Sequence, residues 1–405
     1  MKDFNYYAPT EVVFGKQSEE QVAALVKKYG GTKVLVHYGG QSAVKSGLLD
    51  KICGLLDEGG VPYVKLGGVV PNPRLSLAKQ GIELCRREGV DFILAVGGGS
   101  VIDSAKCIAY GVPLVGEADV WDIYLGKITP ETMLPVASVL TIPAAGSEMS
   151  EASVITNEDG DVKLGYSNNM SRPKFAIMNP ERTFTLPPYQ TAAGVTDMMM
   201  HTMERYFTLD DDMDLTTDLA EAVLRRMKTA VFDVLKNPED YRQRTQIMWG
   251  GSVAHWGLTG CGISDDWATH QIEHELSGMF DVTHGAGLAA IWPSWARYVL
   301  ADQTDGPEIH AKRLRRFVRF AVNVMDVPND FTDPDTTAQK GIEAMERFYH
   351  AIGMPINIHE LIGRFPSVPE IKEMVRKCSR DYTATCGAFK VLNADDMTAI
   401  YRLAR

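Results

Sequence analysis

One aspartate and five histidines between residues 197 and 284 carry side chains that commonly bind metal ions. The six residues are Asp197, His201, His255, His270, His274 and His284. Asp197 precedes His201 by four residues, and this interval places both side chains on one face of a helix. The same interval separates His270 from His274. The spacing therefore predicts a metal site whose ligands project from helices, and it leaves all six residues as candidates.

The donor types limit the metal and the reaction. Imidazoles with one carboxylate and no thiolate suit Fe(II), Zn(II) or a similar divalent ion. The order His270-Gln-Ile-Glu-His274 differs from the His-Glu-x2-His motif of zinc proteases, because its glutamate is displaced by two positions. We therefore do not expect a protease. A single histidine on a helix is more often structural than a ligand, so the metal prediction depends on the whole set.

A glycine-rich turn follows the apolar segment Phe92-Ile-Leu-Ala-Val96 and precedes a segment with helical spacing. In this turn, Gly97-Gly98-Gly99-Ser100, the backbone can approach a ligand closely, and the start of the helix attracts an anion. We expect a pyrophosphate there, with Asp103 and Lys106 sharing one face of the helix. The usual Gly-x-Gly-x2-Gly motif is absent, so the fold would be a variant of the dinucleotide-binding arrangement. The alternative is a glycine turn required by sterics alone.

The first predicted strand, residues 34–38, ends in the segment Tyr38-Gly39-Gly40-Gln41-Ser42, which contains no carboxylate. Many NAD-binding folds place an acidic residue here for the adenosine ribose. Small residues leave space for a 2′-phosphate, and Ser42 can donate a hydrogen bond. The segment therefore predicts NADP(H) rather than NAD(H).

A second loop of small residues runs from Thr141 to Ser150 at the end of another predicted strand. Its hydroxyl groups, including those of Thr141 and Ser147, are candidates for holding the nicotinamide side of the cofactor. The alternative for this loop is an ordinary surface turn. Lys163, considered alone, is best explained as a solvated lysine.

The chain of 405 residues divides near residue 186 by pattern. Before it, short β-rich segments alternate with helical ones, which predicts a parallel α/β sheet. The strand candidates are residues 34–38, 63–66, 92–96, 136–141, 152–155 and 175–178. After it, long amphipathic helical patterns dominate. We expect an α/β dinucleotide-binding domain over residues 1–186 and an all-helical metal-binding domain over residues 187–405.

Charge and composition exclude several classes of partner. A net charge of −11 without a Lys/Arg run argues against nucleic acid. No apolar segment approaches the roughly 18 residues of a membrane span, and no signal core follows the first residues. The six cysteines are scattered, which is typical of reduced structural thiols, although Cys261 is close in sequence to the histidines. We expect a cytoplasmic protein.

The combined motifs resemble the iron-containing (group III) alcohol dehydrogenase family. The resemblance rests on Gly97-Gly-Gly-Ser-x2-Asp103-x2-Lys106, Thr141-x5-Ser147-Glu148, Gly194-x2-Asp197-x3-His201, His270-x3-His274-x9-His284-Gly285, Gly67-Gly-Val-Val-Pro-Asn72-Pro73 and Phe184-Thr-Leu-Pro-Pro188. The chain is most similar to the branch of NADPH-dependent butanol dehydrogenases and broad aldehyde reductases. In that branch Tyr-Gly-Gly also ends the first strand, and Asp-Trp-Ala-Thr-His contains the third ligand, here His270.

The resemblance implies roles for individual residues. The metal ligands are Asp197, His201, His270 and His284, with the metal in a cleft between the two domains. His274 matches a non-ligand histidine near the nicotinamide and the substrate, and is therefore the candidate catalytic residue. Lys163 and Asn72 match cofactor-side positions. The segment Tyr6 to Phe14 has β character and, by resemblance, pairs between the subunits of a homodimer.

The reaction that the resemblance implies is hydride transfer between NADP(H) and a small primary alcohol or aldehyde, with Fe(II) as the first metal choice and Zn(II) as the second. Two alternatives remain: a lyase of the dehydroquinate synthase type, and an NAD-preferring member of the same family. Three residues depart from the family pattern. Ala145 replaces a threonine, Gln41 stands where the NADPH branch often has glycine, and His255 has no matching role.

Overall fold

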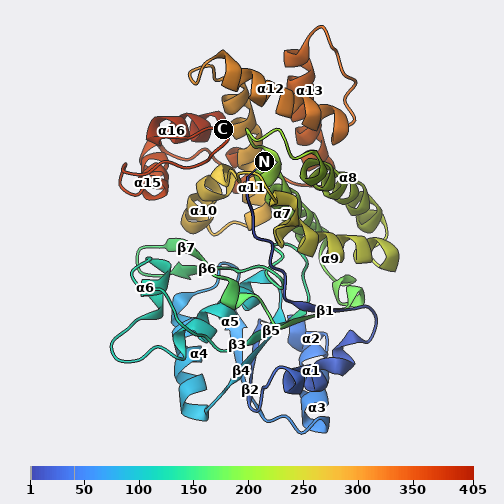
Figure 1. Ribbon diagram of the computed structural model, residues 1–405, viewed down its shortest axis with the longest axis vertical. Coiled ribbons are helices and arrows are strands. Elements are labelled where there is room, and N and C mark those ends of the chain that lie inside the picture. Colours follow the sequence, from blue (N-terminus) through green and yellow to red (C-terminus); the bar gives the residue numbers. More distant parts are fainter. Residues whose placement is uncertain (1, 41) are drawn as a thin grey trace. The chain divides into compact units, whose positions relative to one another are not determined.

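The computed structural model describes residues 2–40 and 42–405, which form two compact units (Figure 1). One unit contains residues 7–185, and the other contains residues 186–405 together with the N-terminal segment up to Tyr6. The glycine-rich turn at residues 97–100 therefore lies in the first of these units, and the candidate metal ligands between residues 197 and 284 lie in the second. Gln41, which belongs to the segment used to predict the cofactor, lies outside the described residues.

The first unit is built on a six-stranded parallel sheet, as the alternating pattern predicted. Its strands lie in the order β1-β8-β5-β4-β2-β3, and every pair of neighbours is parallel. They are β1 (Glu11–Phe14), β2 (Val34–Gly39), β3 (Tyr63–Val69), β4 (Phe92–Gly97), β5 (Val136–Leu140) and β8 (Phe175–Met178). All residues of β4 and β5 are buried, as expected of central parallel strands covered on both faces.

Helices cover both faces of this sheet (Figure 1). The helices of this unit are α1 (Val22–Lys28), α2 (Ser42–Lys45), α3 (Leu48–Glu58), α4 (Leu75–Glu88), α5 (Gly99–Gly111) and α6 (Val120–Tyr124), with 3-10 turns η1 (Ser18–Gln21), η2 (Asn169–Ser171) and η3 (Pro180–Thr183). Val34 and Val36 of β2 pack with the apolar residues of α1 and α3. His37 points to the opposite face, where its Nε2 lies 2.9 Å from Ser104 Oγ of α5. Alternate side chains of β2 therefore face α1 and α3 on one side of the sheet and α5 on the other.

The predicted strand at residues 152–155 does not belong to the parallel sheet. It forms β6 (Ala152–Asn157), which pairs with β7 (Val162–Ser167) in a separate antiparallel hairpin. The physical reason is visible in its burial, because buried and half-buried residues intermix along β6, whereas the central strands are continuously buried. The β structure predicted for residues 6–14 is also shorter than expected. It is limited to β1, which pairs with β8 of the same chain.

The second unit is helical throughout its long elements, as predicted. It contains α7 (Pro188–Tyr206), α8 (Asp214–Lys236), α9 (Tyr241–His255), α10 (Ala268–Phe280), α11 (His284–Ala301), α12 (Pro307–Asn323), α13 (Pro334–Ala351), α14 (Ile358–Ile362), α15 (Val368–Cys378), α16 (Ala394–Leu403) and the 3-10 turn η4 (Leu258–Gly260). Every residue of α7 from Thr191 to Tyr206 is buried, so α7 is the central helix of this unit. Among the described residues, no helix has the length and apolarity to cross a membrane.

Candidate metal centre and cofactor loops

The four predicted ligands come together in the helical unit. Asp197 and His201 lie one turn apart on α7, His270 lies on α10, and His284 is the first residue of α11. The Oδ1 atom of Asp197 is 3.4 Å from His201 Nδ1, 3.8 Å from His270 Nε2 and 3.8 Å from His284 Nε2. One carboxylate oxygen therefore faces a ring nitrogen of each of the three histidines.

These distances fit a divalent metal. With metal–ligand bonds of about 2.1 Å, two ligand atoms of a tetrahedral site are about 3.4 Å apart. Asp197 Oδ1, His201 Nδ1 and His270 Nε2 are buried, and none has a hydrogen-bond partner among the described residues. Burying an unpaired polar atom costs about 1–3 kcal/mol. Three such atoms converging on one point indicate a position that a cation would occupy, where it would remove this cost.

The fourth ligand is more open than the others. The side chain of His284 is 26% exposed, whereas those of Asp197, His201 and His270 are 6–7% exposed. His284 and His274 also form a second group with Glu273, whose potential ligand atoms lie within 4.8 Å of one another. The accessible side of the metal position is therefore the side on which His284 and His274 lie.

The histidines differ in their proton affinity. Burial, assisted by the neighbouring His255 and His270, holds the pKa of His201 well below its usual range. Burial also acts to lower the pKa of His270, but the carboxylates of Asp197 and Glu204 outweigh it and raise the pKa to about 9. His201 is thus neutral at pH 7 and offers a lone pair without deprotonation, which a ligand must have.

A glycine allows α11 to approach α7 at the metal position. A Cβ atom on Gly285 would lie 2.0 Å from the main-chain oxygen of Ala193, a distance that no side chain tolerates. The residue after His284 must therefore be glycine if the first turn of α11 is to lie against α7. This close approach brings His284 to Asp197.

The sequence leaves the roles of His255 and Cys261 open. His255 lies beside the ligand His201, and Cys261 lies in a nearby loop. The ring centroid of His255 is 4.1 Å from that of His201, and its Nδ1 lies 3.3 Å from a guanidinium nitrogen of Arg205. The thiol of Cys261 donates to the main-chain oxygen of Gly257 at 3.5 Å. His255 therefore packs against a ligand, and Cys261 stabilises its own loop.

Sequence reasoning missed two glutamates of this site and the backbone conformation of Trp267. Glu204 and Glu273 contact the outer ring nitrogens of His270 and His284, and the Trp267 ring centroid lies 5.2 Å from that of His270. A signal was available for Glu204, because it follows Asp197 by seven residues and so shares its helix face. Trp267 has a positive φ of 62°, which a sequence pattern does not predict.

In the α/β unit, the glycine turn connects β4 to α5 as predicted. Gly97 ends β4 and Gly98 precedes the first turn of α5. A Cβ atom on Gly97 would lie 2.4 Å from the side chain of Val101, so this glycine is required by packing within the turn itself. A Cβ atom on Gly99 would have only Ala145 within 4 Å, at 3.5 Å. Gly99 is therefore the position where the backbone is open to a ligand.

Asp103 and Lys106 of α5 hold the second small-residue loop. Asp103 accepts hydrogen bonds from Ser147 Oγ at 2.5 Å and from the Val154 amide at 3.0 Å. Lys106 is fully buried and donates to the main-chain oxygens of Ser147, Ser150 and Ala152 at 2.7–2.9 Å. Lys106, which the motif placed on one helix face with Asp103, therefore holds this loop, because its ammonium group is directed into it. Direct contact of Asp103 and Ser147 with the cofactor stays a prediction.

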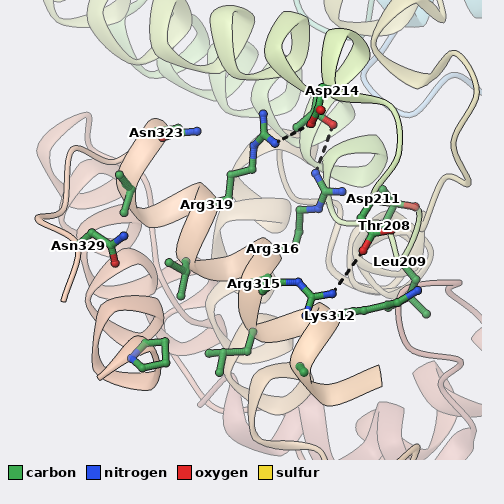
Figure 2. Close-up of a pocket in the computed structure, with 16 residues that line it drawn as sticks. Thr208, Leu209, Asp211, Asp214, Lys312, Arg315, Arg316, Arg319, Asn323 and Asn329 are labelled. Atoms are coloured by element: carbon green, nitrogen blue, oxygen red, sulfur yellow. Dashed lines mark hydrogen bonds and ion pairs between the residues drawn. The ribbon is translucent and has the colours of Figure 1, made fainter. Parts of the chain in front are cut away.

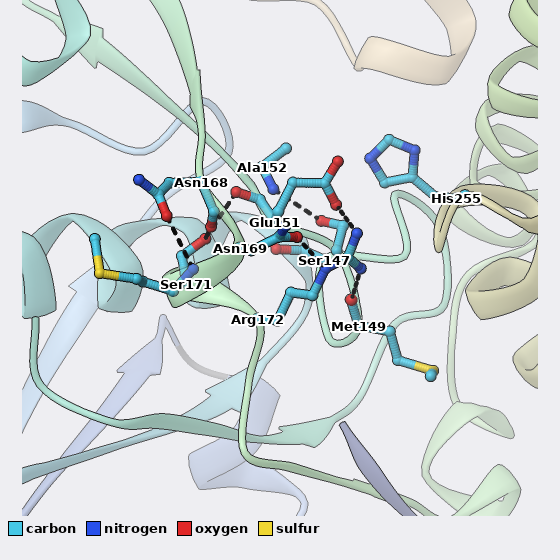
Figure 3. A network of polar contacts seen from close by, with 12 residues as sticks. Ser147, Met149, Glu151, Ala152, Asn168, Asn169, Ser171, Arg172 and His255 are labelled. Carbon is cyan, nitrogen blue, oxygen red and sulfur yellow. Dashed lines mark hydrogen bonds and ion pairs between the residues drawn. The ribbon is translucent and has the colours of Figure 1, made fainter. Parts of the chain in front are cut away.

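Arg172 holds the same loop through residues that alternate with the contacts of Lys106 (Figure 3). Its guanidinium donates to the main-chain oxygen of Met149 at 2.7 Å and to Asn169 Oδ1 at 2.9 Å. It also pairs with Glu151 at 2.5 Å. Two buried cations, Lys106 and Arg172, thus fix the carbonyl groups of one loop, which gives the loop a defined shape for binding.

The other predicted cofactor residues lie at the ends of strands or in loops. Gly39 ends β2, Gly40 follows it and Ser42 begins α2. Asn72 has a left-handed φ of 53° in the loop before α4, and Thr141 directly follows β5. Lys163 lies on β7 of the hairpin. Ser100 lies in the first turn of α5.

A separate cavity of about 550 Å³ lies between α8 and α12 (Figure 2). Its arginines are already engaged: Arg315 pairs with Asp211 at 3.4 Å, and Arg319 pairs with Asp218 at 2.7 Å. No histidine is among the described residues that line it. The cavity is therefore not part of the metal centre.

Comparisons with known proteins agree with this arrangement. The model of "Iron-containing alcohol dehydrogenase" matches residues 9–180, and that of "Fe-containing alcohol dehydrogenase family, C-terminal" matches residues 191–405. The chain is 37% identical to NADH-dependent butanol dehydrogenase A of Clostridium acetobutylicum over 403 residues, covering 99% of each chain. It is 32% identical over 407 residues to the NADPH-dependent aldehyde reductase YqhD of Escherichia coli, covering 100% of each.

A solved structure shares the whole fold. The crystal structure of NADH-dependent butanol dehydrogenase A from Thermotoga maritima matches with a TM-score of 0.92 at 33% identity, covering 100% of this chain and 99% of the other. The two family models and this crystal structure thus cover both units of the chain along nearly its full length. The chain belongs to the iron-containing alcohol dehydrogenase family and is an oxidoreductase of alcohols and aldehydes.

Proposed function

We propose that this protein is an NADP(H)-dependent alcohol dehydrogenase that interconverts small primary alcohols and aldehydes of the butanol and butanal type. The metal ligands are Asp197, His201, His270 and His284. The observation that supports this best is the position of Asp197 Oδ1, which faces ring nitrogens of all three histidines at 3.4–3.8 Å. Fe(II) is the first choice of metal and Zn(II) the second, since both accept this donor set.

The residues of the site have distinct tasks. A divalent metal, when bound, supplies Lewis-acid polarisation of a carbonyl oxygen, and the nicotinamide supplies the hydride. Asp197 contributes negative charge to the ligand set, and the buried histidines exclude water from its inner side. His274 lies on the accessible side, with its ring centroid 5.6 Å from that of His284, and we assign it the proton that the alcohol oxygen gains or loses.

The surroundings of the ligands favour a small neutral substrate. Met198, Met199 and Met200 lie between the two ligands of α7 in the sequence and are buried, and Trp267 lies beside His270. Arg205 contacts His255, but it also donates to the main-chain oxygens of His201 and Ala254. Its charge is therefore engaged within the protein. A lyase of the dehydroquinate synthase type needs basic residues for an acidic phosphorylated substrate, and this environment does not favour it.

The preference for NADP(H) is supported by the end of β2. No carboxylate occurs from Tyr38 to Lys45. Gly40 is exposed, and a Cβ atom added there would have nothing within 4 Å, which is compatible with a 2′-phosphate at this position. The names of the relatives do not decide the question, because one is called NADH-dependent and another NADPH-dependent.

Steady-state kinetics with butanal test this proposal directly. We expect a higher kcat/KM with NADPH than with NADH, and metal analysis of anaerobically purified protein should find one divalent ion per chain. A clear preference for NADH would refute the cofactor assignment while leaving the enzyme class intact. Absence of activity with both cofactors across a panel of short aldehydes would refute the substrate class.

We also propose a cytoplasmic homodimer whose partner is a small molecule, with neither nucleic acid nor membrane involved. All six cysteines are unpaired, which suits a reducing compartment. β1 is the last strand of its sheet, so among the described strands only β8 pairs with it. An exposed strand edge is a suitable surface for pairing with a second copy. Sedimentation analysis should give twice the mass of one chain.

A further inference from the structure

Two buried glutamates contact the metal-binding histidines from the side opposite to the metal position. Glu204 lies near the end of α7 and is 3% exposed, and Glu273 lies on α10 and is fully buried. Neither is among the four predicted ligands. A buried carboxylate is costly unless it is paired and hydrogen-bonded, so both need an explanation.

Glu204 fixes His270 by two contacts through one oxygen atom. Its Oε1 accepts from the main-chain amide of His270 at 2.9 Å and lies 2.7 Å from His270 Nδ1. The main-chain oxygen of Glu204 also accepts from the Asp266 amide at 2.7 Å, just before α10 begins. The backbone and the ring of His270 are therefore both held by the same residue.

Glu273 fixes His284 in a comparable way. Its Oε2 contacts His284 Nδ1, and its Oε1 accepts from Ser277 Oγ. A Cβ atom on Gly287 would lie 2.4 Å from Glu273 Oε1, so the glycine in the first turn of α11 makes room for this carboxylate. The position of Glu273 thus depends on features of both α10 and α11.

Both contacts have the same consequence for the ring. When Nδ1 donates to a carboxylate, its proton is fixed there and the lone pair of Nε2 is directed away. In both histidines, Nε2 is the nitrogen that faces Asp197 Oδ1, at 3.8 Å in each case. Resting on the metal site of the proposed function, we infer that Glu204 and Glu273 are positioning residues. They fix the tautomer and orientation of His270 and His284 and increase their affinity for the metal.

Metal affinity separates this role from a purely structural one. We would prepare Glu204→Gln and Glu273→Gln, which keep the shape and one acceptor oxygen but remove the charge. The dissociation constant for Zn²⁺ would be measured on metal-stripped protein by competition with a chelator, together with the Tm of the metal-free form. We expect each variant to bind Zn²⁺ about 10–100-fold more weakly than the wild type, as is typical of such outer partners.

The matched control is Glu221→Gln. Glu221 is also buried, at 3% exposed, and bonds to Tyr206, Arg319 and Asn323 rather than to a histidine. It should lower the Tm without changing the Zn²⁺ dissociation constant. Should Glu273→Gln fail to fold, Ser277→Ala removes one contact of Glu273 and should still weaken Zn²⁺ binding by a smaller factor.

The outcomes distinguish the inference from the function on which it rests. If the wild type and both glutamine variants bind Zn²⁺ equally well, the positioning role is overturned and the metal site stands. Ser277→Ala takes the place of Glu273→Gln in this comparison if Glu273→Gln does not fold. If the wild type itself binds no Zn²⁺ or Fe²⁺, the metal assignment fails and the inference fails with it.

Discussion

Asp197 Oδ1 and His201 Nδ1 lie 3.4 Å apart on successive turns of α7, and neither has a hydrogen-bond partner among the described residues. Half of the proposed metal site is therefore present on one buried helix. The other half depends on α10 and α11, which contribute His270 and His284. Because a helix fixes the first pair rigidly, the affinity for metal should depend strongly on whether the second pair is present.

Replacing His270 or His284 by alanine should abolish metal binding and activity together. Each substitution leaves only three of the four ligands and removes one histidine from beside the buried Asp197 carboxylate. Metal content by elemental analysis and aldehyde reduction by absorbance would be measured on the same preparations. His359→Ala, at an exposed histidine, is the control and should retain both properties. Full metal content in either ligand variant would refute its assignment.

His274→Ala should separate metal binding from catalysis. His274 is not among the four proposed ligands, so the metal content should stay at the wild-type level. Loss of a general acid or base typically costs about 10²–10⁴-fold in rate, and kcat should fall within that range. An unchanged kcat would contradict the proton-transfer role, and a loss of metal would instead identify His274 as a ligand.

Gly40→Asp should reverse the proposed cofactor preference. The new carboxylate has free space at this exposed position and would repel a 2′-phosphate. We expect kcat/KM with NADPH to fall by about tenfold or more, which corresponds to roughly 1.4 kcal/mol, while kcat/KM with NADH changes little. Gly40→Asn has the same shape without the charge and should affect both cofactors equally. Equal losses in the aspartate variant would mean that no phosphate lies near Gly40.

Lys106→Met should destabilise the α/β unit. The buried ammonium group donates to the main-chain oxygens of Ser147, Ser150 and Ala152, and these three oxygens would lose their partner. Leaving such acceptors unpaired should lower the free energy of unfolding by about 3 kcal/mol, measured by urea denaturation. Lys79→Met is the control, because Lys79 is half-exposed and pairs with Asp119 at the surface. Its loss should cost at most about 1 kcal/mol.

His37 should make the α/β unit sensitive to acid. Burial lowers its pKa from 6.5 to about 4, so the unfolded chain takes up a proton at a higher pH than the folded chain. The stability that the neutral ring provides is complete above pH 6.5 and is lost as the pH falls towards 4, by up to about 3 kcal/mol. His37→Gln removes this dependence. The difference in urea midpoint between wild type and variant should therefore shrink from pH 7 to pH 4.5, and a constant difference would contradict the assignment.

Local sequence patterns indicate the α/β character of the first unit and the helical character of the second. They also place Asp197, His201, His270 and His284 among six candidate ligands. The character of the two units follows from local periodicity, whereas the choice of four ligands among the six candidates rests on the resemblance to the family. The four-residue interval of a helix fixes which side chains share a face, and a continuous apolar run such as Phe92 to Val96 indicates a strand buried on both faces.

The partners that surround these residues depend on contacts between segments that are distant in the chain. The motif gives Lys106 no partner, and the fold directs its ammonium group into the loop between β5 and β6. The strand predicted at residues 152–155 pairs in a hairpin outside the main sheet. Glu204 and Glu273 were not recognised because their contacts join helices that are distant in the chain or depend on the space beside Gly287. Local sequence patterns set which face a side chain occupies, whereas packing between distant segments sets what that face meets.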